Sequence, residues 1–259
     1  MIVNKPSPLL DALEIKPSIG IVCLAGAGGK KTTLYRLATL YPGRVGITST
    51  SAHITPFPDQ ISAYQVITHE KQLPMLIKTA ANTRRLIAYA QPSARKGYLA
   101  GVPPTLVARI HQQAKFDISL VKADESYNHW IKAPIVEETI IPEEATIIIP
   151  ILSVLAIGQP LTEKIAYQVR QIESIIKIKE GETLRPLHLA RLLASAQNSL
   201  KKSHTAKIIP LINMIDNPIW EKQGIITAEI ALSLTDCFDR VVLTCMSQIN
   251  PSVITVRRS

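Results

Sequence analysis

The sequence predicts an α/β fold with a mostly parallel β-sheet and helices on both faces. Short apolar runs typical of buried strands alternate along the chain with stretches in which apolar residues recur at helical spacing. The strand candidates are almost continuously apolar, as in parallel strands that are buried on both faces. Hydrophobic residues make up 46% of the 259 positions and charged residues 19%, so the chain can bury a large core.

The first elements are a strand, a glycine-rich turn and a helix. The run at 18–26 is apolar and ends in glycine, as expected of a buried strand that leads into a tight turn. Residues 31–43 place leucines and Tyr41 on one helical stripe and end in a Pro-Gly pair, which stops the helix. The run at 44–51 indicates a second strand, and we expect it to form a parallel pair with the first.

The rest of the chain continues this alternation without an internal repeat or a long linker. Further strands are expected at 83–90, 118–124, 146–151, 207–215 and 239–245. Further helices are expected at 103–114, 163–176, 186–197 and 226–235. We therefore expect a single domain over residues 1–259, in which residues 160–206 could form a helical subregion packed on the sheet.

Composition argues against a membrane or secreted protein. The longest apolar stretch, 146–158, contains a proline and falls short of the ~20 residues that a membrane helix needs. The N-terminal segment carries acidic residues and no signal-peptide pattern. The three cysteines lie in apolar surroundings typical of buried thiols in a reducing compartment. These features predict no membrane span and a cytoplasmic location.

The positive charge is concentrated in the N-terminal half of the chain. The formal net charge is +9; residues 1–130 hold 15 basic and 7 acidic side chains, whereas residues 131–259 hold 14 and 13. Such an excess can attract an anion, whether a nucleotide, a phosphorylated cofactor or nucleic acid, but a solvated basic face explains it equally well. Aromatic residues are only 5% and the basic residues are scattered, which disfavours nucleic acid as the partner.

A glycine- and lysine-rich segment joins the first strand to the first helix, which is the context of a phosphate-binding loop. The candidates for binding a nucleotide there are Gly26, Ala27, Gly28, Gly29, Lys30, Lys31, Thr32 and Thr33. Glycines let backbone N–H groups approach an anion, the helix N-terminus adds positive potential, a lysine reaches the outer phosphates and a hydroxyl holds Mg²⁺. The segment therefore predicts a P-loop NTPase-like three-layer architecture.

The loop departs from the strict pattern G-x-x-x-x-G-K-[S/T]. If Lys30 is the phosphate lysine, Leu24 stands at the first glycine and Lys31 at the hydroxyl. If Lys31 is the phosphate lysine, Ala25 and Lys30 stand at the two glycines. The shorter pattern G-x-x-G-K-T fits if one lysine is an insertion, and a glycine-rich turn with exposed lysines is the alternative without a ligand.

Polar residues end two later strands. Asp124 ends the strand at 118–124, where a carboxylate beside a phosphate loop can bind Mg²⁺, so Thr32 and Asp124 are the metal candidates. Asn213 and Asp216 have the N-x-x-D spacing that lets an amide and a carboxylate read the edge of a nucleobase. A turn or capping role is the alternative for these polar residues, because Asn and Asp often end strands as turn formers.

These pieces, in this order, resemble the YqeC family, whose members are described as selenium-dependent hydroxylase accessory or selenium cofactor biosynthesis proteins. The matching segments are GAGGKKTTL at 26–34, ITSTSAHITP at 47–56, KGYLAGVPP at 96–104, KADESYNHWIKAPIVEETIIP at 122–142 and NMID at 213–216. The segment at 122–142 aligns without a gap and brings Lys132 and Glu138 into family positions. The resemblance therefore spans most of the chain.

The resemblance implies that the segment after Asp124 covers the phosphates or holds an acceptor substrate through Lys132 and Glu138. An ordinary surface ion pair is the alternative for these two residues. His53 could donate a hydrogen bond to a ligand, and a capping or packed histidine explains it as well.

The chain also departs from the family pattern. Glu125 stands where the family has Gly and adds a negative charge beside the phosphate site. Tyr127 stands where the family has Arg, which removes a candidate clamp for the transition state. The extra lysine of the loop is a third departure, and the family's HEP, which becomes Glu137-Glu138-Thr139, is a fourth.

The combined prediction is a protein that binds a nucleoside triphosphate, ATP or GTP, with Mg²⁺. By the resemblance it would assist maturation of a selenium-dependent molybdenum hydroxylase or its cofactor, with that enzyme or its maturation proteins as partners. The catalytic candidates, for hydrolysis or for phosphoryl or nucleotidyl transfer, are Lys30, Lys31, Asp124 and Lys132. A nucleotide-gated binding or carrier protein without turnover is the main alternative, and a nucleic-acid-binding protein is the weaker one.

Overall fold

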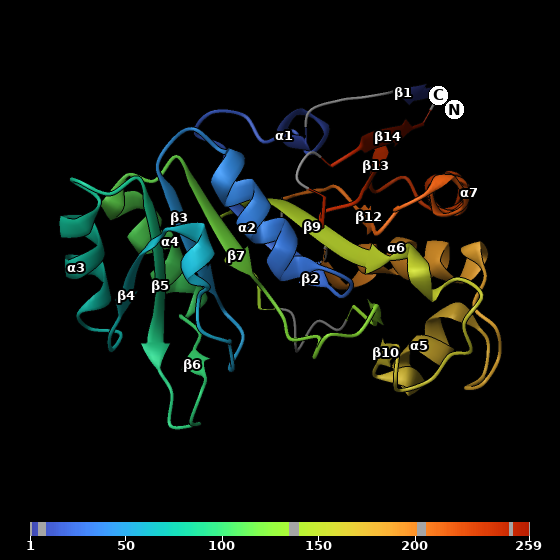
Figure 1. Ribbon diagram of the computed structural model, residues 1–259, viewed down its shortest axis with the longest axis horizontal. Coiled ribbons are helices and arrows are strands. Elements are labelled where there is room, and N and C mark those ends of the chain that lie inside the picture. The colour runs from blue at the N-terminus through green and yellow to red at the C-terminus, as the bar shows by residue number, and fades with distance from the viewer. Residues whose placement is uncertain (1, 5–8, 135–139, 201–205, 249–250, 259) are drawn as a thin grey trace.

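The computed structural model describes residues 2–4, 9–134, 140–200, 206–248 and 251–258 (Figure 1). Its main feature is a large sheet with the strand order β1-β14-β13-β12-β9-β2-β7-β3-β5-β4. These strands are β1 (Ile2–Asn4), β2 (Gly20–Gly26), β3 (Val45–Ser49), β4 (Tyr64–Ile67), β5 (Leu86–Pro92), β7 (Ile118–Lys122), β9 (Ala145–Ser153), β12 (Leu211–Asn213), β13 (Arg240–Thr244) and β14 (Val253–Arg257). Two short strands complete this sheet: β6 (Leu99–Ala100) pairs with β5, and β11 (Lys207–Ile208) pairs with β9. A separate small sheet is formed by β8 (Ile131–Lys132) and β10 (Ala166–Tyr167).

The large sheet is mostly parallel. Every neighbouring pair from β13 to β4 along this order runs parallel, whereas β14 is antiparallel to both β13 and β1. Parallel strands need helical crossovers, and the helices lie between them in the sequence. These are α1 (Leu9–Ala12), α2 (Lys30–Leu40), α3 (Leu73–Ala80), α4 (Pro104–Ala114), α5 (Val169–Ile176), α6 (Pro186–Leu200) and α7 (Pro218–Leu234). The predicted fold class is confirmed.

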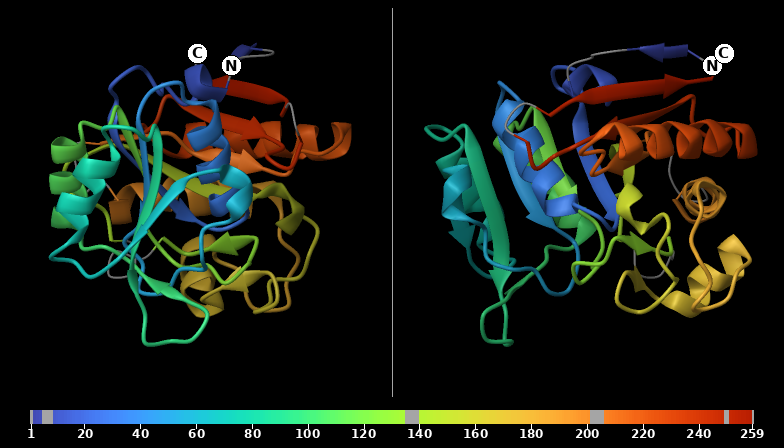
Figure 2. Two further views of the ribbon diagram at one scale, coloured as in Figure 1. Left: turned by 60° about the vertical axis from the view of Figure 1, so that its left-hand side comes forward. Right: turned by 45° about the vertical axis from the view of Figure 1, so that its right-hand side comes forward.

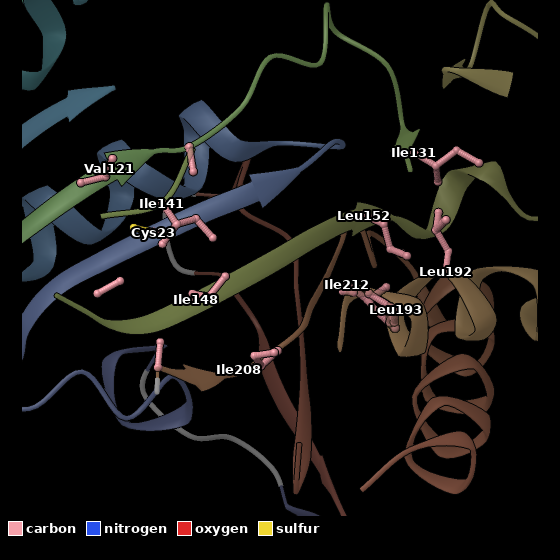
Figure 3. Packing of buried hydrophobic residues seen from close by; sticks show 14 of the residues in the cluster. Cys23, Val121, Ile131, Ile141, Ile148, Leu152, Leu192, Leu193, Ile208 and Ile212 are labelled. Atoms are coloured by element: carbon pink, nitrogen blue, oxygen red, sulfur yellow. The ribbon is translucent and has the colours of Figure 1, made fainter. Parts of the chain in front are cut away.

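Helices cover both faces of the sheet, as Figure 2 shows from two sides. Successive side chains of β2 face opposite sides of the sheet. Val22 and Leu24 pack in the hydrophobic cluster that includes residues of α1 and α2, whereas Ile21 and Cys23 pack in the cluster that includes residues of α3 to α7. On the second face, Leu192 and Leu193 of α6 lie beside strand residues of β9 and β12 (Figure 3). Residues 160–206 thus contribute two helices to the same core as the sheet.

The first two predicted strands do not pair with each other, although the sequence predicts that they do. The first two predicted strands, β2 and β3, are parallel, but β7 lies between them and pairs with both. This arrangement places the carboxyl end of β7 directly beside the loop that follows β2, near the middle of Figure 1. Asp124, two residues after β7, therefore comes within reach of the loop.

Some predicted elements have different bounds in the structure. The strand expected at 207–215 is interrupted between β11 and β12 at Pro210, which lacks the N–H group that a strand ladder needs. Helix α7 begins eight residues before its predicted start, because the side chain of Asn217 accepts hydrogen bonds from two backbone N–H groups and Pro218 fits the first turn. Among the described helices, none is both long and apolar enough to cross a membrane.

Candidate phosphate-binding site

The loop between β2 and α2 has two glycines at which a side chain would collide with the backbone of the sheet. Gly26 and Gly28 have φ of +91° and +80°, a conformation that other residues rarely adopt. A Cβ at Gly26 would lie 2.3 Å from the carbonyl oxygen of Ile151, and one at Gly28 would lie 2.5 Å from the backbone nitrogen of Ser153. These contacts are with the backbone of β9, which cannot move aside easily, so the glycines allow the loop to lie against the sheet.

The amides of the loop itself are bonded to the protein. Three of them donate 2.9 Å hydrogen bonds: Gly26 N to Asp124 Oδ2, Ala27 N to Ile151 O, and Gly28 N to His129 O. The expectation that the whole loop turns its N–H groups toward an anion therefore does not match this structure. The loop is folded onto the sheet and onto the segment after β7.

The N-terminal turn of α2 provides the donors that the loop does not. Helix α2 begins at Lys30, and the first N–H groups of a helix have no acceptor within the helix. Its N-cap, Gly29, has no side chain to accept from them, and the first turn carries no acidic residue. The positive end of the helix dipole is thus left without a negative group of its own. The helix donors available for an anion are therefore the N–H groups of the first turn, at Lys30, Lys31 and Thr32.

Beneath the loop, Asp124 is paired with two lysines. Lys30 Nζ lies 2.6 Å from Asp124 Oδ1, and Lys132 Nζ lies 3.2 Å from Asp124 Oδ2, with all three side chains at most 2% exposed. Lys30 Nζ also donates to the carbonyl oxygen of Gly26, and Lys132 Nζ donates to that of Glu125 at 2.8 Å. Burial lowers the pKa of Lys30, and the charge of Asp124 opposes that shift. This cluster attaches the start of α2 to the end of β7.

A pocket of about 360 Å³ opens on the other side of the α2 N-terminus. Its lining includes Lys31 and Thr32 of α2, which are exposed, and Lys122 at the end of β7. Lys31 Nζ lies 3.4 Å from Thr55 Oγ1, and Lys122 Nζ donates to Ser51 Oγ at 2.7 Å. Burial and the nearby charge of Lys30 lower the pKa of Lys122 to about 8. Lys30 lines the pocket as well, but its Nζ is turned to Asp124. The pocket therefore brings together Lys31, Lys122 and a helix N-terminus.

One carboxylate lines the same pocket. Glu125 accepts a 2.7 Å hydrogen bond from the backbone N–H of His53 and another from the hydroxyl of Tyr127. Burial disfavours the charged form of Glu125, but these two hydrogen bonds and the charge of Lys122 hold its pKa below the usual range. The hydrogen bond between Tyr127 and Glu125 raises the pKa of Tyr127 to about 12. His53 and Tyr127, from two different loops, therefore hold Glu125 at the pocket wall.

The N-x-x-D segment has a different place from the one its spacing predicts. Asn213 is buried, and its Nδ2 donates to Gly28 O at 2.9 Å while its Oδ1 accepts from Met246 N at 3.0 Å. Because both polar atoms bond to backbone, this side chain supports the loop rather than reading a nucleobase. Asp216 is exposed and accepts from the Cys245 thiol. The described residues that line the pocket include neither Asn213 nor Asp216.

The residues expected to bind Mg²⁺ do not fit that ion as they are arranged. Thr32 faces the large pocket, but Asp124 opens to a separate cavity of about 20 Å³ that it shares with Lys132 and residues of α6. Both oxygens of Asp124 already contact positive or N–H groups. In the described parts of the chain, no three His, Cys, Asp or Glu side chains gather into a metal site. Thr32 and Asp124 therefore do not face a common cation position.

Three predicted residues remain: Thr33, Lys132 and Glu138. Thr33 is buried and donates to Gly29 O at 3.0 Å, so its hydroxyl serves the helix. Lys132 is buried against Asp124, which rules out the alternative of a surface ion pair for that lysine. Glu138 lies outside the described residues. Lys122 was not among the predicted site residues, although a lysine in the apolar run at 118–124 is a signal of a polar cavity at the strand end.

Comparison with known proteins gives one family. The family model described as "YqeC protein" matches residues 22–170, which contain the loop, Asp124 and Lys132. A curated relative, "Uncharacterized protein YqeC" of Escherichia coli (strain K12), is 24% identical over 199 residues, which cover 76% of this chain and 76% of the relative. The family match covers more than half of the chain and includes the elements that build the pocket.

Proposed function

The chain belongs to the YqeC family, and from the geometry of its α2 N-terminus we propose that it binds the phosphate chain of a nucleoside triphosphate. One observation carries the proposal. The first turn of α2, Lys31 and Lys122 all reach the same 360 Å³ pocket. This is a concentration of hydrogen-bond donors and positive charge that suits a polyphosphate.

The positions of the lysines favour an anionic ligand on energetic grounds. Two consecutive lysines at the N-terminus of a helix oppose the helix dipole, which stabilises negative groups there. Lys30 is compensated by Asp124, but neither Lys31 nor Lys122 forms an ion pair with any residue that the structure describes. A bound phosphate would compensate both, whereas Glu125 is held by His53 and Tyr127 and offsets only part of the charge.

The remainder of the pocket can hold the rest of the ligand. Its walls also include apolar and aromatic side chains, among them Ile54, Phe57 and Tyr98. A pocket with an apolar body and a few convergent polar groups is typical of small-molecule sites. Because Asn213 is occupied in supporting the loop, we expect ATP and GTP to bind with similar affinity.

A carrier function without turnover is the second candidate, and one observation favours it. Asp124, which accepts a hydrogen bond from the loop at Gly26 N, is neutralised by Lys30 and Lys132 and does not line the pocket. It is therefore not placed to orient a water molecule or an acceptor at the phosphates. This candidate predicts nucleotide binding with negligible hydrolysis by the protein alone.

The role that the resemblance implies, maturation of a selenium-dependent molybdenum hydroxylase or its cofactor, stays a prediction. The described pocket residues account for binding an anion. Selenium or molybdenum chemistry would have to come from a partner protein or a second ligand.

Calorimetric titration of ATP and GTP into the wild type and into Lys31→Ala tests the proposal. We expect the wild type to bind both nucleotides and the variant to bind about 10- to 100-fold more weakly, which is the value of a charge-assisted hydrogen bond. Lys78→Ala, an exposed lysine on α3 remote from the pocket, is the matched control and should bind as the wild type does. Failure of the wild type to bind either nucleotide, or equal binding by Lys31→Ala, would contradict the proposal.

A further inference from the structure

We propose that the phosphate ligand is bound without a divalent cation, and that the ammonium group of Lys31 takes the charge-neutralising role that Mg²⁺ has in phosphate loops of the G-K-[S/T] type. This inference rests on the proposed function and concerns the same pocket. It follows from the disagreement between the metal that the loop predicts and the side chains that the structure places there.

The side chains of Lys30 and Lys31 point to different places. Lys30 follows Gly29, is the first residue of α2, and turns its Nζ back to the carbonyl oxygen of Gly26 and to Asp124. In the G-K-[S/T] pattern the residue after this lysine supplies the hydroxyl that holds Mg²⁺. Here that residue is Lys31, which is exposed and lines the pocket. A positive charge thus stands where the pattern has a metal ligand.

The carboxylates of the site do not offset this change. Asp124 contacts Lys30, Lys132 and the N–H of Gly26, so a cation could reach it only by displacing a buried lysine. Glu125 is the one acidic side chain among the described residues of the pocket lining, and it already accepts hydrogen bonds from His53 and Tyr127. Mg²⁺ is usually held by one or two carboxylates together with phosphates and water. Here both oxygens of the one carboxylate are engaged by His53 and Tyr127, which leaves the hydroxyl of Thr32 as a weak substitute.

The charges also oppose a cation at this place. Lys31 and Lys122 both line the pocket, so a divalent ion there would be repelled by two ammonium groups near the phosphates. Free Mg²⁺ binds the ligand phosphates itself and would compete with the lysines for them. We therefore expect Mg²⁺ to leave the affinity unchanged or to lower it. The ligand class that follows is a metal-free diphosphate or triphosphate anion.

The experiment compares binding in excess EDTA with binding in excess Mg²⁺, using ATP and inorganic pyrophosphate as probes. Wild-type protein is expected to bind both probes in EDTA at least as tightly as in Mg²⁺. Lys31→Thr, which restores the hydroxyl of the pattern, is expected to lose about 10-fold or more of its affinity in EDTA. Lys78→Thr on α3 is the matched control and should keep the wild-type affinity. Because Lys31 is exposed, its replacement should leave the thermal unfolding midpoint unchanged.

Each other outcome decides a different question. Wild-type binding that requires Mg²⁺ would overturn this inference and leave the proposed function standing. Lys31→Thr with wild-type affinity in EDTA would remove Lys31 from the role given to it here. No binding of either probe under both conditions would overturn the proposed function itself.

Discussion

Asp124→Ala is expected to lower the free energy of unfolding by about 3–5 kcal/mol, because it leaves two buried ammonium groups without their counter-charge. Lys30 and Lys132 are almost inaccessible to solvent, and the carboxylate of Asp124 lies within 3.2 Å of both. The substitution also removes the acceptor of the Gly26 N–H. The two lysines would then have to lose their protons or admit water, and either change opens the junction between the loop and β7.

Urea unfolding followed by tryptophan fluorescence measures this effect, since Trp130 lies at the pocket beside the loop. Asp124→Asn keeps an acceptor for Gly26 but removes the charge, and we expect it to lose most of the same stability. Asp236→Ala is the control: this aspartate side chain is 95% exposed and pairs with Arg258, so its loss should cost no more than about 1 kcal/mol. An Asp124→Ala variant as stable as Asp236→Ala would show that the buried cluster does not hold the site together.

Asn213→Ala is the second substitution with a large expected effect. Its side chain joins Gly28 O to Met246 N, two buried backbone groups from distant parts of the chain. Leaving each group unpaired costs about 1–3 kcal/mol, so both stability and the position of the loop should suffer. We expect the affinity for ATP to fall with the stability, although Asn213 does not line the pocket.

A matched asparagine separates these two effects. Asn217 also forms two hydrogen bonds with the backbone, both as an acceptor, but it caps α7 at the surface. Asn217→Ala should cost about 1 kcal/mol and leave ATP affinity unchanged. If Asn213→Ala binds ATP as tightly as Asn217→Ala does, Asn213 does not support the binding loop.

Local patterns in the sequence predicted much of the fold. The strand at 18–26, the glycine turn and the helix after it were readable because apolar periodicity and glycine report local conformation. The exposed edge strand β4 was missed because it is short and buries little of its length. The position of β7 between β2 and β3 could not be read, because strand order depends on tertiary packing rather than on neighbouring residues.

The sequence predicted which residues form the site better than it predicted what those residues contact. Lys30 and Lys31 were identified from the loop pattern and Asp124 from the end of an apolar strand. The pairing of Asp124 with Lys132 could not be read, because it requires a segment that returns under the loop. The N-x-x-D spacing indicated a base-reading role for Asn213, yet the same donor and acceptor bond equally well to backbone. Sequence spacing gives the residue types at a site, whereas which partner satisfies each polar atom is decided by the packed chain.

We propose above that phosphate is bound at the N-terminus of α2. Backbone amide chemical shifts, followed while pyrophosphate or ATP is titrated into isotope-labelled protein, test it most directly. We expect the largest shifts on the amides of Gly29, Lys31 and Thr32, and a smaller change at Ala27, whose N–H is bonded to Ile151. Saturable shifts that cluster elsewhere and leave the first turn of α2 unchanged would contradict it.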